Sequence, residues 1–293
     1  MNRSTERILT THVGSLPRPD DLIRTMFAFQ EGVPVDRAAL AERTKSAVAE
    51  VVARQLDAGV DVPSDGEMSK PSYVTYVVDR LEGFDGSSHP VETYADLEDF
   101  PVLHRKVFGD PGRSRRRLPA CDRPVAVRDP DAALVDVAHL QVALPAGQEA
   151  FLNAASPGVI ALFFRNDFYA TREEYLFAIA EAMRVEYEAI TNAGLLVQID
   201  CPDLAMGRHI QFGSRSLDEF RREAALNVEA LNHATRNIDP ERLRMHGMQP
   251  ARPTTRARTT ATCRSPTSST SSSPRAPPRS RSRPPTRATR TRT

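Results

Sequence analysis

Apolar residues follow two patterns along this chain: short continuous runs, and longer runs at helical spacing. Short runs that are typical of buried parallel strands occupy 8–13, 60–62, 125–127, 159–164, 195–199 and 242–245. Apolar positions three and four residues apart predict helices at 36–56 and 129–144, and after Thr171 and Ser216. The alternation of strands with helices predicts an α/β fold.

Capping boxes mark the starts of the last two predicted helices. Glu174 follows Thr171 by three residues, and Glu219 follows Ser216 at the same spacing. In such a box, each side chain satisfies a backbone N–H group that the first helical turn leaves free. The sequence therefore predicts the helix starts as well as the helices.

Polar residues follow several of the predicted strands. Gly14-Ser15, Glu67, Asp200 and His246 each come at or soon after the end of an apolar run. Such positions meet at the carboxyl end of a (β/α)₈ TIM-type barrel, where ligands bind. We therefore predict such a barrel with about six of its eight units present. Taken alone, Asp200 is equally compatible with capping the turn or helix that follows it.

The charge divides the chain into an acidic body and a basic tail. Residues 247–293 hold eleven of the 39 basic side chains and none of the 38 acidic ones, so residues 1–246 carry a net charge of −10. The tail is nearly all Thr, Ser, Pro, Arg and Ala, a composition typical of disorder. We predict a truncated barrel over 1–246 and a disordered tail over 247–293. A nucleic-acid-binding arm is the alternative interpretation of the tail.

A reading-frame shift after His246 is the interpretation that we favour for the tail. If each true codon takes the last base of one written codon and the first two of the next, 254–271 decodes as NYEGPHHGDVPLADIIDI. In the same register, 280–292 decodes as ISFEAANPRHAHE. These segments look like a helix start and a strand, the elements that a barrel would need next. The nucleotide sequence across codon 246 tests this hypothesis.

Cysteine content and hydropathy indicate a cytoplasmic protein. Cys121, Cys201 and Cys263 are too widely spaced for a disulfide framework. The first residues contain no apolar signal segment, and no apolar run reaches the roughly 18 residues of a membrane span. We expect neither secretion nor a membrane partner.

Five segments together resemble the cobalamin-independent methionine synthase family, in its catalytic barrel form and the short bacterial single-barrel members. They are TTHVGSLPRP (10–19), DAGVDVPSDGEMSKPSY (57–73), SPGVIALFFRNDFY (156–169), VQIDCPDLAMGRH (197–209) and RLRMH (242–246). The resemblance implies zinc-dependent methyl transfer from 5-methyltetrahydropteroyl-glutamate to the thiol of homocysteine. Zinc makes the thiol a bound thiolate at neutral pH.

The resemblance also implies roles for particular residues. Those implied to bind the amino-acid substrate are Val13, Gly14, Ser15, Glu67 and Asp200. Ala120, Cys121 and Phe164 correspond to residues on the pterin side of the site. His246 corresponds to the first zinc ligand of the family. The implied partners are a small-molecule thiol and a methyl donor, and nucleic acid is not expected as a partner.

The sequence departs from the family at the metal and beside Asp200. Met248 stands two residues after His246, where the family has a ligand Cys, and the ligand Glu appears only in the shifted frame across Arg283. Catalytic zinc needs about three protein ligands, so His246 alone is not a site. Met206 replaces an acidic residue that the family often has there, which leaves open a related thiol alkyltransferase such as an epoxyalkane:coenzyme M transferase. We expect this chain to be impaired, and an open barrel to aggregate through its free strand edges.

Overall fold

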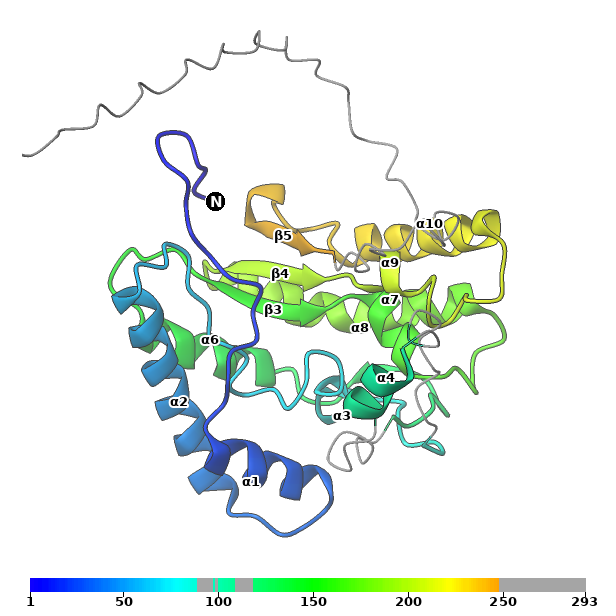
Figure 1. Cartoon of the computed structure of the whole chain (residues 1–293), viewed down its shortest axis with the longest axis horizontal. Coiled ribbons are helices and arrows are strands. Elements are labelled where there is room, and N and C mark those ends of the chain that lie inside the picture. Colours follow the sequence, from blue (N-terminus) through cyan, green and yellow to red (C-terminus); the bar gives the residue numbers. More distant parts are fainter. Residues whose placement is uncertain (89–96, 98–99, 109–117, 248–293) are drawn as a thin grey trace, which may run out of the picture. The chain divides into compact units, whose positions relative to one another are not determined.

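The structure is a computed structural model that describes residues 1–88, 97, 100–108 and 118–247 (Figure 1). The chain divides into two units, Met1–Thr262 and Cys263–Thr293. The predicted tail beyond Gly247 lies outside the described residues, so the boundary between body and tail stays a prediction.

Helices and strands alternate through the described part of the chain. The helices are α1 (Asp20–Gln30), α2 (Arg37–Asp57), α3 (Val77–Arg80), α4 (Pro101–Phe108), α6 (Ala132–Ala143), α7 (Pro157–Phe163), α8 (Arg172–Asn192), α9 (Asp203–Met206), α10 (Leu217–Ala234) and the 3₁₀ turn η2 (Pro240–Arg242). The strands are β1 (Leu81–Glu82), β2 (Ala126–Val127), β3 (Phe151–Ala155), β4 (Leu196–Asp200) and β5 (Leu243–His246). Within these residues none of the helices has both the length and the apolar composition needed to cross a bilayer.

The central sheet is parallel, with β4 between β3 and β5. Two parallel bridges, Thr11 to Val62 and Ser64 to Phe151, continue it on the β3 side. In Figure 1 the dark-blue N-terminal segment passes in front of β3 and β4 before it enters α1. Five extended segments therefore lie side by side in chain order, and Asp200 and His246 end two of them.

The two faces of the sheet differ because successive side chains of a strand point to opposite sides. The face toward the main core carries Leu152, Ala154, Val197 and Ile199. Helix α8 contacts both β3 and β4, and α7 and α10 pack on α8. On the other face, Phe151 and Leu196 form a separate small cluster with Val62. Asn153 and Gln198 share that second face by register, so it is the face with buried polar groups.

The helix predictions are confirmed. Asp36 caps α2, and its carboxylate accepts hydrogen bonds from the backbone N–H groups of Ala38 and Ala39. Both capping boxes form, at Thr171 for α8 and at Ser216 for α10. The helix predicted at 129–144 is α6.

The strand predicted at 159–164 is wrong, because these residues lie in helix α7. Ser156 caps the helix by accepting a hydrogen bond from the N–H of Val159 at 3.0 Å, and Pro157 occupies its first turn. Every residue of α7 except Leu162 is buried. An apolar run buried on all sides looks the same in a strand and a helix, and Ser-Pro before it was the distinguishing signal. The strand of this unit is β3, which sequence reasoning missed.

Three other predicted strands are shorter than expected. The segments at 8–13 and 60–62 are extended but contribute single bridges at Thr11 and Val62. Ala126 and Val127 pair antiparallel with β1 and do not join the central sheet. The strands at 195–199 and 242–245 are confirmed as β4 and β5. The described residues thus form a mixed α/β fold with a parallel sheet, and within them the sheet does not close into a barrel.

Candidate functional site

Asp200 ends β4 as a buried carboxylate, only 6% exposed. Its oxygens accept hydrogen bonds from Asn153 Nδ2 at 3.1 and 3.3 Å and from Gln198 Nε2 at 3.2 Å. Burial raises the pKa of Asp200, while these bonds and His246 act in the opposite direction. The nearest helix, α9, begins at Asp203 and has no side-chain cap. The capping interpretation of Asp200 is therefore wrong, and the carboxylate faces a polar network.

His246 lies beside Asp200 because β5 pairs with β4 in parallel register. The distance from His246 Nδ1 to Asp200 Oδ1 is 3.1 Å. A carboxylate on one ring nitrogen of a histidine is the usual arrangement when the other nitrogen binds a metal. In the part of the chain that the structure describes, however, no group of three His, Cys, Asp or Glu side chains could hold a metal ion. These residues do not fit a zinc site.

The predicted turn Val13-Gly14-Ser15 reaches the same network. The carbonyl oxygen of Val13 accepts hydrogen bonds from Gln198 Nε2 at 2.5 Å and Asn153 Nδ2 at 3.1 Å. Gly14 has φ +142°, a conformation that side chains rarely adopt. A Cβ at Gly14 would lie 2.4 Å from Asn153 Nδ2, so the turn approaches β3 more closely than any other residue would allow.

Glu67 is buried, 3% exposed, and is the one non-glycine residue of the described chain with a positive φ, +58°. The Nε of Arg18 donates to the Glu67 carbonyl at 3.0 Å, and the Arg18 guanidinium lies 3.6 Å from Glu67 Oε2. Glu67 Oε2 accepts no hydrogen bond. Burial raises the pKa of Glu67 to about 7, and the charges of Asp65 and Asp200 act in the same direction against Lys70 and Arg18. The positive φ and the buried oxygen that accepts no hydrogen bond make Glu67 a candidate functional position.

Glu67→Gln is expected to stabilise the protein above pH 7 and to change little near pH 4.5. The folded-state pKa of about 7 exceeds the ordinary 4.5, so stability is present at low pH and lost as pH rises through 7. The glutamine removes a penalty of up to about 3 kcal/mol in the free energy of unfolding. Urea unfolding at about pH 4.5 and about pH 8 measures it.

The exposed Glu229 of α10 supplies the control, as Glu229→Gln. Its pH dependence should match that of the wild type. An equal change in both variants, or the same gain for Glu67→Gln at both pH values, would contradict burial as the cause.

The residues predicted on the pterin side form a second group. Cys121 pairs in parallel with Asn166, and its N–H donates to the Arg165 carbonyl at 2.7 Å. Ala120, Cys121 and Phe164 are each 0% exposed. Burial raises the pKa of the Cys121 thiol to about 11. Cys121 and Phe164 belong to the hydrophobic core, and their pterin role stays a prediction.

Sequence reasoning missed four polar residues of this site: the buried Asn153, Gln198 and Lys70, and the partly buried Arg18. Asn153 was missed together with β3, although Gln198 lies in the strand that was predicted. Arg18 lies in the quoted motif at 10–19 and Lys70 in the one at 57–73, and the charge of Lys70 within a segment that is otherwise largely buried was the available signal. Lys70, 2% exposed, donates from Nζ to the carbonyl of Asn153.

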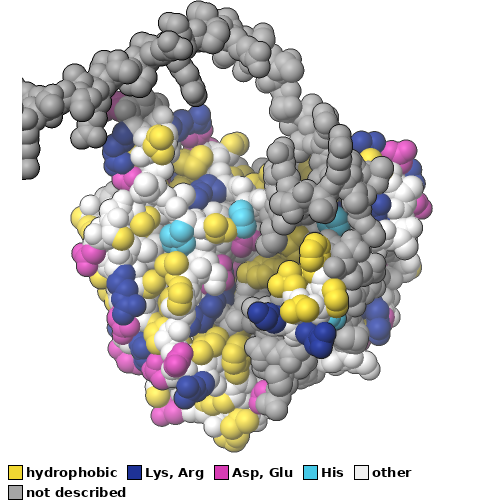
Figure 2. Space-filling model, in the orientation of Figure 1, with side chains coloured by type: hydrophobic (Ala, Val, Ile, Leu, Met, Phe, Trp, Pro, Cys, Tyr) yellow, Lys and Arg dark blue, Asp and Glu magenta, His cyan; other side chains and the backbone are white. Residues whose placement is uncertain are grey.

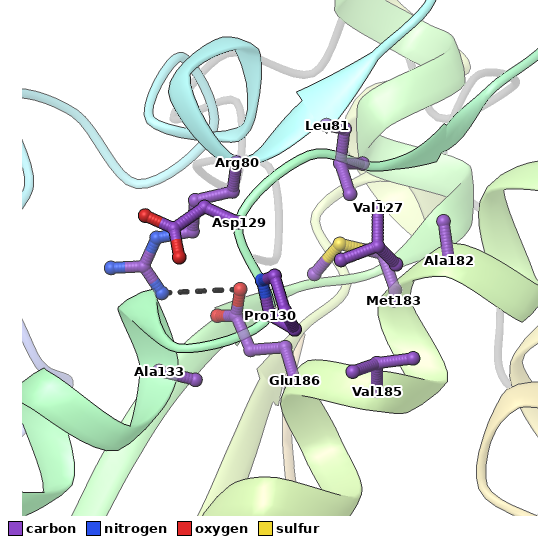
Figure 3. Close-up of a pocket in the computed structure, with 10 residues that line it drawn as sticks. All are labelled: Arg80, Leu81, Val127, Asp129, Pro130, Ala133, Ala182, Met183, Val185 and Glu186. Carbon is purple, nitrogen blue, oxygen red and sulfur yellow. Dashed lines mark ion pairs between the residues drawn. The ribbon is translucent and has the colours of Figure 1, made fainter.

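A hollow lies outside this network, on the helical layer (Figure 3). Arg80 and Glu186 form an ion pair of 3.2 Å on one side, and Leu81, Val127 and Met183 form the apolar side. None of the residues predicted for substrate or metal lines it. The hollow is therefore no counterpart of the predicted site. The face in Figure 2 mixes basic, acidic and apolar side chains, with histidines beside acidic groups near its centre.

Fold and site define a mixed α/β protein with a buried polar network at the carboxyl ends of parallel strands. Residues 8–115 match the family model described as "Cobalamin-independent synthase, Catalytic domain". The methionine synthases of Sulfolobus acidocaldarius and Saccharolobus solfataricus are each 26% identical, over 226 and 238 residues, or 76% and 81% of this chain. The chain is thus similar to cobalamin-independent methionine synthases.

The likeness is partial in length. The two matches span 60% and 61% of the archaeal proteins, so the chain corresponds to about three fifths of these relatives. A B12-independent methionine synthase from Shewanella sp. W3-18-1, solved in complex with selenomethionine, superposes with a TM-score of 0.53. That match is 19% identical and covers 70% of this chain and 51% of the other, which supports a shared fold.

Proposed function

We propose that the site at the ends of β3, β4 and β5 binds the amino-acid half of a sulfur-containing α-amino acid. The observation that carries the proposal is the buried carboxylate of Asp200, which accepts hydrogen bonds from side chains of two strands. Glu67 is a second buried carboxylate, and the charge of Asp200 contributes to the raised pKa of Glu67. Two buried carboxylates suit an ammonium group, since a positive ligand relieves their desolvation. The turn at Gly14-Ser15 would hold the ligand's carboxylate through backbone and hydroxyl groups.

The proposed reaction of the intact enzyme is methyl transfer from 5-methyltetrahydropteroyl-glutamate to homocysteine, which forms methionine. The resemblance of the five motifs and the named relatives support it. We also propose that the five extended segments belong to a (β/α)₈ barrel, as in the family. Their parallel order and the helical crossovers between β3, β4 and β5 support that topology.

The metal half of the site is proposed to be lost in this chain. His246 has a suitable carboxylate partner, but the sequence has Met248 where the family has a Cys, and the described residues do not complete a ligand set. A reading-frame shift after His246 accounts for the loss. Sequencing the gene across codon 246 tests it, and an unambiguous in-frame reading would overturn it.

Calorimetry on the full chain tests the proposed site, with L-methionine as the probe and 3-(methylthio)propionate as the analogue without an amino group. L-Methionine is expected to bind at least about tenfold more tightly, because only it carries an ammonium for the two carboxylates. Asp200→Asn should weaken L-methionine binding and leave the analogue's binding nearly unchanged. Equal affinity for both ligands, or no binding of L-methionine at millimolar concentration, would overturn the proposal.

Zinc content, measured on the same protein by atomic absorption after dialysis, tests the proposed loss of the metal-binding part of the site. The chain as written should retain far less than one zinc per molecule. Stoichiometric zinc that survives dialysis would show that its ligand set is intact.

A further inference from the structure

Asn153 connects the two parts of the site that the sequence places far apart. Its side-chain NH₂ donates to the Asp200 carboxylate and to the carbonyl of Val13, and its side chain fills the space beside Gly14. Asn153 is 2% exposed. One buried amide therefore sets both the carboxylate of β4 and the N-terminal turn.

The orientation of this amide follows from its neighbours. A carboxylate and a carbonyl only accept hydrogen bonds, so the group that faces them must be the NH₂. The Oδ1 atom of the same amide lies beside Gly14, and it has no hydrogen-bond partner. A buried acceptor without a partner destabilises the fold and needs an explanation.

Buried side chains from other segments hold the main chain of Asn153 and Ala155 at the end of β3. Lys70 Nζ donates to its carbonyl, and the nearby Tyr76 hydroxyl accepts a hydrogen bond from the N–H of Ala155 at 3.1 Å. Tyr187 donates to the carbonyl of Ala155 at 2.5 Å. Buried side chains thus fix the carboxyl end of β3, so the Asn153 side chain has little freedom to turn away from the site.

We infer that Asn153 determines the preference of this site for an amino group. This inference rests on the proposed function of the site. An ammonium carries three N–H donors, and Asp200, Glu67 and Asn153 Oδ1 supply three buried acceptors. The NH₂ of the same amide orients Asp200 toward the ligand. Asn153 thereby acts both as a positioning residue and as an acceptor of its own.

The test compares Asn153→Leu with Asn227→Leu in the full chain. Asn227 is a matched control because it is 4% exposed and donates to a buried carboxylate, Asp203, at 2.9 Å, yet contacts no residue predicted to bind substrate. Leucine has the same branched shape and the same number of side-chain heavy atoms as asparagine, although it is larger, and it neither donates nor accepts hydrogen bonds. The readout is the ratio of dissociation constants for L-methionine and 3-(methylthio)propionate.

Asn153→Leu is expected to reduce the preference for L-methionine over 3-(methylthio)propionate, taken from the two dissociation constants, at least about tenfold. Asn227→Leu is expected to leave this preference unchanged. Both variants should lose stability, so a purely structural role would weaken the two ligands equally. An unchanged preference in Asn153→Leu, with the wild type still selecting L-methionine, would overturn this inference alone. A wild type that binds neither ligand would remove the proposed function and this inference with it.

Asn153→Ser covers the case in which the leucine variant does not fold, as judged by circular dichroism. Its hydroxyl is too short to reach both Asp200 and Val13, so the same loss of preference is expected. Full preference in a folded Asn153→Ser variant would contradict the inference.

Discussion

Arg80→Met should destabilise the protein by about 3 to 5 kcal/mol, the range expected when one partner of a buried ion pair is removed. The Arg80 guanidinium is 2.5 Å from Asp136 and 3.2 Å from Glu186, and both carboxylates are more than nine-tenths buried. Burial alone would lower the pKa of Arg80, but these two carboxylates outweigh it and raise it. Methionine would leave Asp136 without its ion pair and Glu186 with Lys70, 3.8 Å away, as its remaining cation. Figure 3 shows the Arg80–Glu186 pair that would be lost. Chemical denaturation at pH 7 measures the loss.

Two comparison variants test whether the loss of stability comes from the burial of the ion pair or from the loss of any ion pair. Arg221 pairs with Asp218 on the surface of α10, and Arg221→Met should change stability little. The double variant Arg80→Met/Asp136→Leu should recover part of the loss, since it removes the buried carboxylate that has lost its ion pair. A loss in Arg80→Met no larger than in Arg221→Met would show that the Arg80 cluster contributes no more than a surface pair.

Gly14→Ala should cost about 4 kcal/mol and abolish L-methionine binding. The φ of +142° is nearly restricted to glycine, and an added Cβ would meet Asn153 at 2.4 to 2.6 Å. Backbone strain of about 1 to 3 kcal/mol adds to an overpacking cost of similar size. Because Asn153 would have to move, Asp200 would lose its donor at the same time. Thermal unfolding and calorimetry measure the two effects.

Gly147→Ala isolates the conformational part of that cost. Gly147 also has a positive φ, +78°, but a Cβ there would meet nothing within 4 Å. Its loss should be about 1 kcal/mol, with ligand binding unchanged. Similar losses in the two variants would mean that the contact between the turn and Asn153 does not constrain the site.

The helices could be predicted because their signals are local. Asp36, Thr171 and Ser216 each cap a helix through hydrogen bonds to backbone N–H groups only two or three residues away. The strand that ends in Asp200 was equally visible, as an apolar run interrupted by a carboxylate. In each case the residues that decide the structure are close together in sequence.

The segment at 151–164 could not be predicted by the same means. FLNAA and PGVIALF are both apolar and both buried, so periodicity does not separate strand β3 from helix α7. With β3 missed, Asn153 was missed as well. Its partners Val13 and Asp200 are 140 and 47 residues away, and only the folded sheet shows that one amide bridges them.

The sequence alone determined the α/β pattern, the capped helices and the family resemblance. It also identified Asp200, Glu67 and His246 as candidate site residues. These features could be predicted because motifs and caps depend on residues that are close together in sequence. Tertiary structure alone decided that Asp200 is no helix cap, that His246 lies 3.1 Å from it, and that burial raises the pKa of Glu67 to about 7. The physical reason is that desolvation and hydrogen bonds between strands depend on which distant residues surround a group. The site of this protein is a property of strand register and burial, and local sequence specifies neither.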